Sequence, residues 1–147
     1  MSMSKTSFNE LAFYYYLSKV FDCKLHSCFS TSYGNLEYDL FLPDYNILIE
    51  YDSYYYHLER YDFDKVKDEV AVNQLGYTLI RVRERPLNRV SDLSKVIYRE
   101  DASFRELNVV IAKLIIYVKR EFDLIFDMNI DSYRDKRDIA LLKAAYA

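Results

Sequence analysis

The sequence predicts a single α/β domain in which helices flank a mixed β-sheet with a central hairpin. Two observations lead to this prediction. Stretches with helical spacing alternate with runs rich in β-branched and aromatic residues, and the 147 residues include only two glycines and two prolines. So few turn-forming residues indicate mostly regular structure with short connections. Because a domain usually has about 100 to 200 residues, we expect one domain over residues 1–147.

The first half of the chain predicts a helix followed by a hairpin. Residues 7–21 have helical spacing, with Ser7 as the N-cap and Glu10 as its capping-box partner. Residues 23–35 are polar and are expected to form a strand and a turn ending at Gly34. The apolar runs 36–42 and 45–52 are separated by Pro43 and Asp44, so they are expected to pair as antiparallel strands.

The second half of the chain predicts further helices around one more strand. Residues 62–75 have helical spacing and precede Gly76, a residue typical of a helix C-terminus. A strand is predicted over 77–83 and a loop with a short helix over 91–100. An amphipathic helix is predicted over 102–122 and a last helix over 133–147. The helices of 102–147 are expected to extend a core of about 7–87, or to bind a second copy or a protein partner.

Composition and charge favour a soluble, cytoplasmic protein without a membrane partner. The chain is 51% hydrophobic and 29% charged, and no run approaches the roughly 18 apolar residues of a membrane span. The N-terminus lacks the apolar centre of a signal peptide. The net charge of -3 and the pI of about 5.4 argue against a generally cationic coat for nucleic acid, so any phosphate-binding surface must be local.

Four acidic side chains are predicted to lie on one face of the hairpin: Glu37, Asp39, Glu50 and Asp52. The prediction holds if Leu42 pairs with Ile47, because Asp39 then lies opposite Glu50 and side chains alternate along each strand. A loop of odd length would instead place the acids on opposite faces. Opposed like charges destabilise a sheet, and partly buried carboxylates need neutralisation. A hard divalent cation such as Mg²⁺, which prefers oxygen ligands, would neutralise Asp39 and Glu50.

The alternative without a metal is that the acids lie on a solvated face and pair with arginines of the neighbouring strand. Arg81, Arg83 and Arg85 alternate along 77–85 and, with Arg89, form the densest basic cluster of the chain. They are predicted either to contact nucleic-acid phosphates or to pair with the acids of the hairpin. Residues 54–56 are tyrosines, which pack or stack on exposed bases.

A zinc site is a weaker alternative. Cys23, His26 and Cys28 are close in sequence and His57 would be a fourth ligand. Their spacing matches no standard zinc knuckle or ribbon. The two cysteines are therefore expected to remain free thiols in a chain without a secretion signal.

The ordered segments SFNELAFYYYL, LEYDLFLP, IEYDSYYYH, DFDKVK and LGYTLIRVRERPL resemble the PD-(D/E)XK nuclease superfamily, and its very-short-patch-repair-type endonuclease domains in particular. The match covers residues 7–87. The resemblance implies a restriction-endonuclease-like fold and a Mg²⁺-dependent endonuclease, with Mn²⁺ as a substitute. It also implies that the substrate is nucleic acid, DNA being favoured over RNA.

The resemblance also implies a role for each candidate residue. The implied catalytic residues are Glu10, Asp39, Glu50, Asp52, His57 and Lys67. Asp39 and Glu50 would hold the metal, with Asp52 as a further ligand and Glu10 positioning water or a second ion. His57 would act as general base or proton donor. Lys67 would stabilise charge on the phosphate.

Two positions depart from the pattern of the family. Asp52 stands where the motif has lysine, so the implied cation comes instead from Lys67 of the following helix. Ser53 stands where relatives often have glycine. These departures and the acidic pI favour the alternative, a catalytically inactive nuclease-fold protein that binds nucleic acid or a protein partner.

Overall fold

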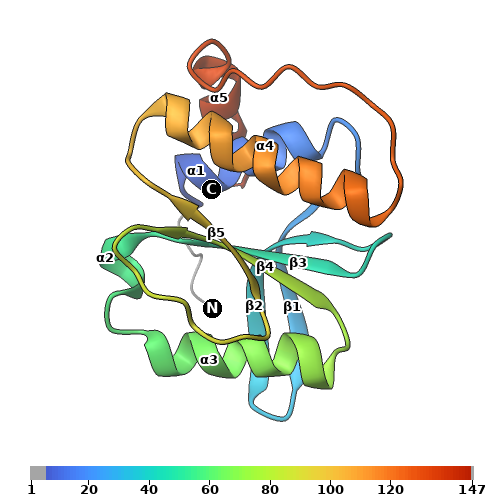
Figure 1. Cartoon of the computed structure of the whole chain (residues 1–147), viewed down its shortest axis with the longest axis vertical. Helices are drawn as coiled ribbons and strands as arrows, with labels where there is room; N and C mark the ends of the chain where they lie inside the picture. Colours follow the sequence, from blue (N-terminus) through green and yellow to red (C-terminus); the bar gives the residue numbers. More distant parts are fainter. Residues whose placement is uncertain (1–5, 147) are drawn as a thin grey trace.

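The computed structural model describes residues 6–146 as a five-stranded mixed sheet flanked by helices (Figure 1). The predicted α/β class is confirmed. The elements in chain order are α1 (Phe8–Leu17), β1 (Lys24–Thr31), β2 (Gly34–Leu42), β3 (Ile47–Asp52), α2 (Tyr54–His57), α3 (Tyr61–Glu69), the π-helical turn η1 (Val70–Gln74), β4 (Thr78–Glu84), β5 (Lys95–Arg99), α4 (Phe104–Glu121) and α5 (Lys136–Tyr146).

The strands lie in the sheet in chain order. β1, β2 and β3 are antiparallel neighbours, whereas β4 and β5 run parallel to β3. Leu42 pairs with Ile47, so the predicted register of the central hairpin is confirmed. The preceding hairpin turns at Gly34, whose φ of 87° is a conformation that glycine adopts without strain.

Helices cover both faces of the sheet. α1 and α4 lie on one side, and α3 lies on the other (Figure 1). On the α1 and α4 side, Leu40, Ile49 and Val82 join the buried face of α4 in one apolar cluster. On the α3 side a smaller cluster includes Leu48 and Val70. Burying both faces explains why every residue of β3 is buried, including its two carboxylates.

Strand β2 changes faces at Asp39. Leu36 and Tyr38 pack in the cluster beneath α3, whereas Leu40 and Leu42 pack in the cluster beneath α1 and α4. Regular alternation would place all four of these residues on one face. The change of face therefore occurs at Asp39, the position where the predicted metal site begins.

The structure corrects the prediction for residues 91–100. We expected a loop with a short helix, but Lys95–Arg99 forms β5, which pairs in parallel with β4. The run Val96, Ile97 and Tyr98 has high β-propensity, and Ile97 is buried. Pairing with β4 therefore holds this segment as a strand, although polar residues flank it in the sequence. Within residues 6–146, none of the helices has the length and apolar character needed to cross a membrane.

Candidate functional site

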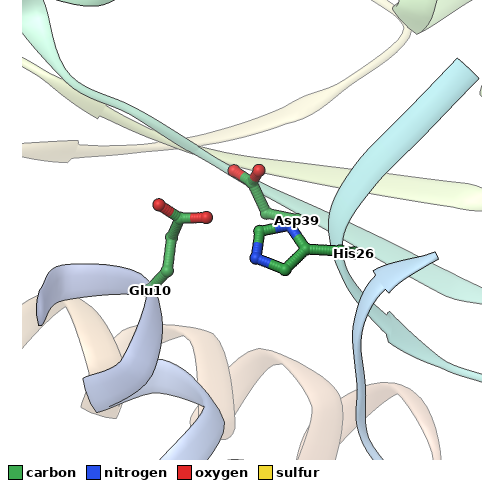
Figure 2. Close-up of side chains that lie close together, drawn as sticks. All are labelled: Glu10, His26 and Asp39. Carbon is green, nitrogen blue, oxygen red and sulfur yellow. The ribbon is translucent and has the colours of Figure 1, made fainter. Parts of the chain in front are cut away.

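Three side chains from three elements converge beside the N-terminal end of α1. Glu10 comes from α1, His26 from β1 and Asp39 from β2 (Figure 2). One potential ligand atom of each lies within 4.8 Å of the others. Carboxylate oxygens and an imidazole nitrogen at this separation form a donor set suited to a divalent cation. We call Glu10, His26 and Asp39 the metal cluster.

Local structure fixes two of these side chains. Ser7 and Glu10 form the predicted capping box, in which the Ser7 hydroxyl accepts from the Glu10 N–H and the Ser7 N–H donates to Glu10 Oε2. His26 has a φ of 52° and lies between the residues that pair with Leu40 and Tyr38, so it faces Asp39 across the hairpin. Its ring is also 2.7 Å from the Thr6 hydroxyl.

Asp39 and Glu50 replace the backbone ladder between β2 and β3. Regular pairing stops at Leu40 and Ile49. Beyond that pair, the Asp39 N–H donates to Glu50 Oε1 at 2.8 Å, and the Tyr51 N–H donates to Asp39 Oδ2 at 2.8 Å. The two carboxylates are therefore neighbours, and Glu50 adjoins the metal cluster.

Asp39 has a raised pKa. Burial raises its pKa well above the ordinary value, and the charges of Glu50 and Glu10 raise it further. Lys67 and the hydrogen bond from Tyr51 act in the opposite direction without cancelling the rise. Burial and the two neighbouring acids therefore both disfavour the charged form of Asp39, and a bound cation would favour that form.

Lys67 supplies a buried cation beside Glu50. Its Nζ lies 2.7 Å from Glu50 Oε2, with both side chains almost inaccessible to solvent. The ammonium also lies 4.6 Å from the centre of the Tyr38 ring, and the Tyr38 hydroxyl donates to the Lys67 carbonyl. α3 therefore places a buried lysine against the Glu50 carboxylate.

Asp52 lies in a second, buried group of charges. Arg81 Nη1 donates to both of its carboxylate oxygens at 3.0 and 3.1 Å, and Arg83 Nη1 donates to Oδ2 at 2.6 Å. Arg81 Nε further donates to Asp68 at 2.6 Å. Asp52 is fully buried, and its oxygens are occupied by arginines. Asp52 therefore lies in a different group of possible metal ligands from Asp39.

His57 belongs to the same group as Asp52. Its Nδ1 lies 2.8 Å from Asp64 Oδ2, and its Nε2 lies 3.5 Å from Asp52 Oδ1. Asp52, His57 and Asp64 are close enough together to suggest a metal site, and Arg81 and Arg83 also lie against the two carboxylates. We call Asp52, His57, Asp64, Asp68, Arg81 and Arg83 the charge network.

The four hairpin acids do not gather on one face. Glu37 lies 3.7 Å from His26 Nδ1 and is partly exposed, whereas Asp52 lies beneath α3 with the arginines. Asp39 and Glu50 connect these two positions. The Asp39 N–H donates to Glu50, and Lys67 and Arg81 both approach the Glu50 carboxylate. Among the described residues, the metal cluster and the charge network are thus separate groups that meet at Glu50.

The structure also corrects the phosphate-binding assignment of two arginines. Arg81 and Arg83 are 0% and 2% exposed, so neither presents its guanidinium to a surface phosphate. They take the other role considered for them, pairing with the acids of the hairpin. Arg85 is exposed, and its Nε lies 3.4 Å from Glu100.

Sequence reasoning missed His26 as a partner of Asp39 and placed it only in the zinc alternative. The register of the first hairpin was the available signal, because a turn at Gly34 with Thr31 as its partner sets His26 opposite Asp39. The zinc set itself does not assemble: among the described residues, His26 and His57 lie in different groups, neither of which includes a cysteine. Cys23 and Cys28 are free.

Comparisons of this chain with models of protein families, with curated proteins and with solved structures found no match.

Proposed function

We propose that this protein is a metal-dependent endonuclease that hydrolyses phosphodiester bonds, with DNA as its preferred substrate. The observation that carries the proposal is the convergence of Glu10, Asp39 and Glu50 beside the buried ammonium of Lys67. The element order, a helix, three antiparallel strands, a helix and a parallel strand, is compatible with the restriction-endonuclease-like fold that the sequence resembles.

The residues present suit a divalent cation. Glu10, His26 and Asp39 offer ligand atoms within 4.8 Å of one another, and the pKa of Asp39 is raised by burial first and then by the charges of Glu50 and Glu10. When bound, such a cation polarises a phosphoryl oxygen and lowers the pKa of a coordinated water. Because an imidazole suits transition metals better than Mg²⁺, the inclusion of His26 favours Mn²⁺ among the ions that support activity.

The protein's own residues have distinct tasks in this proposal. Glu10, His26 and Asp39 would hold the cation, which would supply an activated water. Glu50 keeps Lys67 in position, and the Lys67 ammonium, desolvated against the Tyr38 ring, stabilises the charge that develops on the phosphate. Both ring nitrogens of His57 face carboxylates of the charge network, so its task is to brace β3 rather than to transfer protons.

The test is cleavage of supercoiled plasmid, single-stranded DNA and RNA in the presence of Mg²⁺, Mn²⁺ or EDTA. We expect metal-dependent cleavage by the wild-type protein and its loss in the Asp39→Asn and Lys67→Met variants. Asp44→Asn is the matched control, because Asp44 is an exposed aspartate in the turn of the same hairpin. Cleavage that survives in Asp39→Asn would contradict the proposal.

A second function is favoured by one specific observation. Glu50 is already paired with Lys67 at 2.7 Å, and Asp52 is already bound by two arginines. A scaffold whose strand carboxylates are neutralised internally would serve as a binding protein without catalysis. Calorimetry with Mn²⁺ distinguishes the two functions, since the binding protein requires no metal affinity that depends on Asp39.

A further inference from the structure

A groove runs between the edge strand β5 and the outer surface of α4. It has a volume of about 770 Å³. β5 is the last strand of the sheet, and α4 lies beside it on the upper side of Figure 1. The residues that line the groove are Arg85, Lys95, Val96, Ile97, Tyr98, Glu100, Lys113, Ile116, Tyr117, Arg120 and Glu121.

The groove is positively charged in an acidic protein. Four cationic side chains line it, and all four are exposed: Arg85, Lys95, Lys113 and Arg120. Only two acids, Glu100 and Glu121, share the lining, whereas the whole chain has a net charge of -3. This local excess of positive charge is complementary to a polyanion.

Two tyrosines set the positions of two of these cations. The Arg85 guanidinium lies 3.7 Å from the centre of the Tyr98 ring, and the Lys95 ammonium lies 4.7 Å from the centre of the Tyr117 ring. Cation–π contacts of this kind hold a side chain over a ring. Because cations cover these ring faces, the groove favours contact with phosphates over stacking of bases.

The groove is separate from the metal cluster. His26 belongs to β1, which is the opposite edge of the sheet from β5, and Asp39 belongs to the adjacent strand β2. Lys95 also lies on the edge strand itself, where a lysine disfavours the addition of another strand. A strand from a second copy is thus a poorer occupant than an anionic ligand.

We propose that the groove between β5 and α4 binds the phosphate backbone of nucleic acid without sequence preference. This goes beyond the proposed cleavage activity, because a protein without catalysis would have the same groove. Its contacts would be ionic and exposed, so binding would depend strongly on salt. For four phosphate contacts on duplex DNA, affinity should fall about 150-fold between 50 and 200 mM salt.

The test is fluorescence anisotropy with labelled duplex DNA in EDTA, where metal-dependent cleavage does not occur. In the Lys113→Glu/Arg120→Glu variant two contacts are lost, so the fall over the same salt range should shrink to about 12-fold. The matched control is Lys65→Glu/Arg137→Glu, which changes the net charge equally at two exposed helical positions outside the groove. It should retain most of the salt dependence.

Three results would overturn the proposal. The first is that the wild-type protein fails to bind duplex and single-stranded DNA at 50 mM salt. The second is an equal loss of affinity in the groove and control variants, which would indicate a general charge effect. The third is a change of oligomeric state in the groove variant, measured by sedimentation, while DNA binding stays intact. Asp39→Asn should bind as the wild type does, so failure of cleavage and failure of this proposal are separately visible.

Discussion

At the scale of single residues, Asp39 should destabilise the metal-free protein at neutral pH. Its pKa is raised in the folded state, chiefly by burial, so the unfolded chain releases its proton at a lower pH than the folded chain does. Stability is therefore full below the ordinary aspartate pKa of about 3.9 and falls as pH rises toward the folded pKa. We expect Asp39→Asn to raise the melting temperature at pH 7 and to change it little at pH 3.5.

Bound metal should make the wild type more stable than Asp39→Asn at pH 7, the reverse of the order expected without metal. A ligand that binds only the folded state at 100 times its Kd adds about 2.7 kcal/mol of stability. Saturating Mn²⁺ should stabilise the wild type, whereas Asp39→Asn should gain little because it lacks the central carboxylate. Thermal melts with and without Mn²⁺ make the comparison, and equal stabilisation of both proteins would contradict a site at Asp39.

Asp64 should show the opposite dependence on pH. Burial opposes its charge, but the hydrogen bond with His57 and the nearby Arg81 and Arg83 lower its pKa below the ordinary value. Its charged form therefore stabilises the fold above about pH 3.9, and this stabilisation is lost as pH falls through the folded pKa. Asp64→Asn should cost on the order of 3 kcal/mol at pH 7.

The cost of Asp64→Asn should shrink in acid. Urea titrations at pH 7 and near pH 3 measure the difference, with the exposed Asp62 of the same helix as the matched position. Asp62→Asn should change stability by no more than about 0.5 kcal/mol at either pH. An Asp64→Asn penalty that is equal at both pH values would show that packing, rather than charge, explains the role of Asp64.

At the scale of elements, the start of α1 positions Glu10. Ser7 caps α1 and Ser103 caps α4 by the same bond, from the N–H of the third helical residue to the serine hydroxyl. Ser7→Ala and Ser103→Ala should each cost about 1 kcal/mol. Only Ser7→Ala should weaken Mn²⁺ binding, by about tenfold, since residues that orient a ligand contribute to metal affinity. Calorimetry of both variants with Mn²⁺ tests this. An equal loss of Mn²⁺ affinity in both would show that Glu10 is not a ligand.

Elements with a strong local pattern were predictable, and those defined by distant pairing were not. The capping box at Ser7 and the pairing of Leu42 with Ile47 follow from spacing and turn chemistry, and both are confirmed. β5 was missed because a parallel edge strand depends on β4, which is distant in sequence. The approach of His26 to Asp39 required the register of the first hairpin together with the change of face in β2.

The ion pairs of the hairpin acids could not be predicted either, because they also depend on elements distant in sequence. The sequence placed Lys67 on a helix and two arginines on the next strand, but each acid had more than one available cation. In the structure Lys67 pairs with Glu50 and the arginines pair with Asp52. Which cation meets which acid depends on how α3 crosses the sheet, and no local pattern in the sequence records that crossing.

At the scale of the whole molecule, residues 102–146 form part of the hydrophobic core. α4 buries six apolar side chains against the sheet and α1: Leu107, Val110, Ile111, Leu114, Ile115 and Val118. α5 adds the fully buried Ile139. The Tyr16 hydroxyl of α1 donates to Asp135 at 2.5 Å and accepts from the Asp131 N–H. The C-terminal segment therefore also holds α1, and with it Glu10.

A fragment of residues 1–87, which contains the whole nuclease-like pattern, should consequently not fold. Without α4 one face of the sheet would be exposed, and burying each of its large apolar side chains is worth about 1.5–3 kcal/mol. That loss is comparable to the whole stability of a typical domain, about 5–15 kcal/mol. We expect the fragment to lack dispersed amide resonances in NMR spectra, and the full chain to unfold in one urea transition. A folded fragment would instead show that residues 7–87 form an independent unit, with the groove beside β5 as a later addition to it.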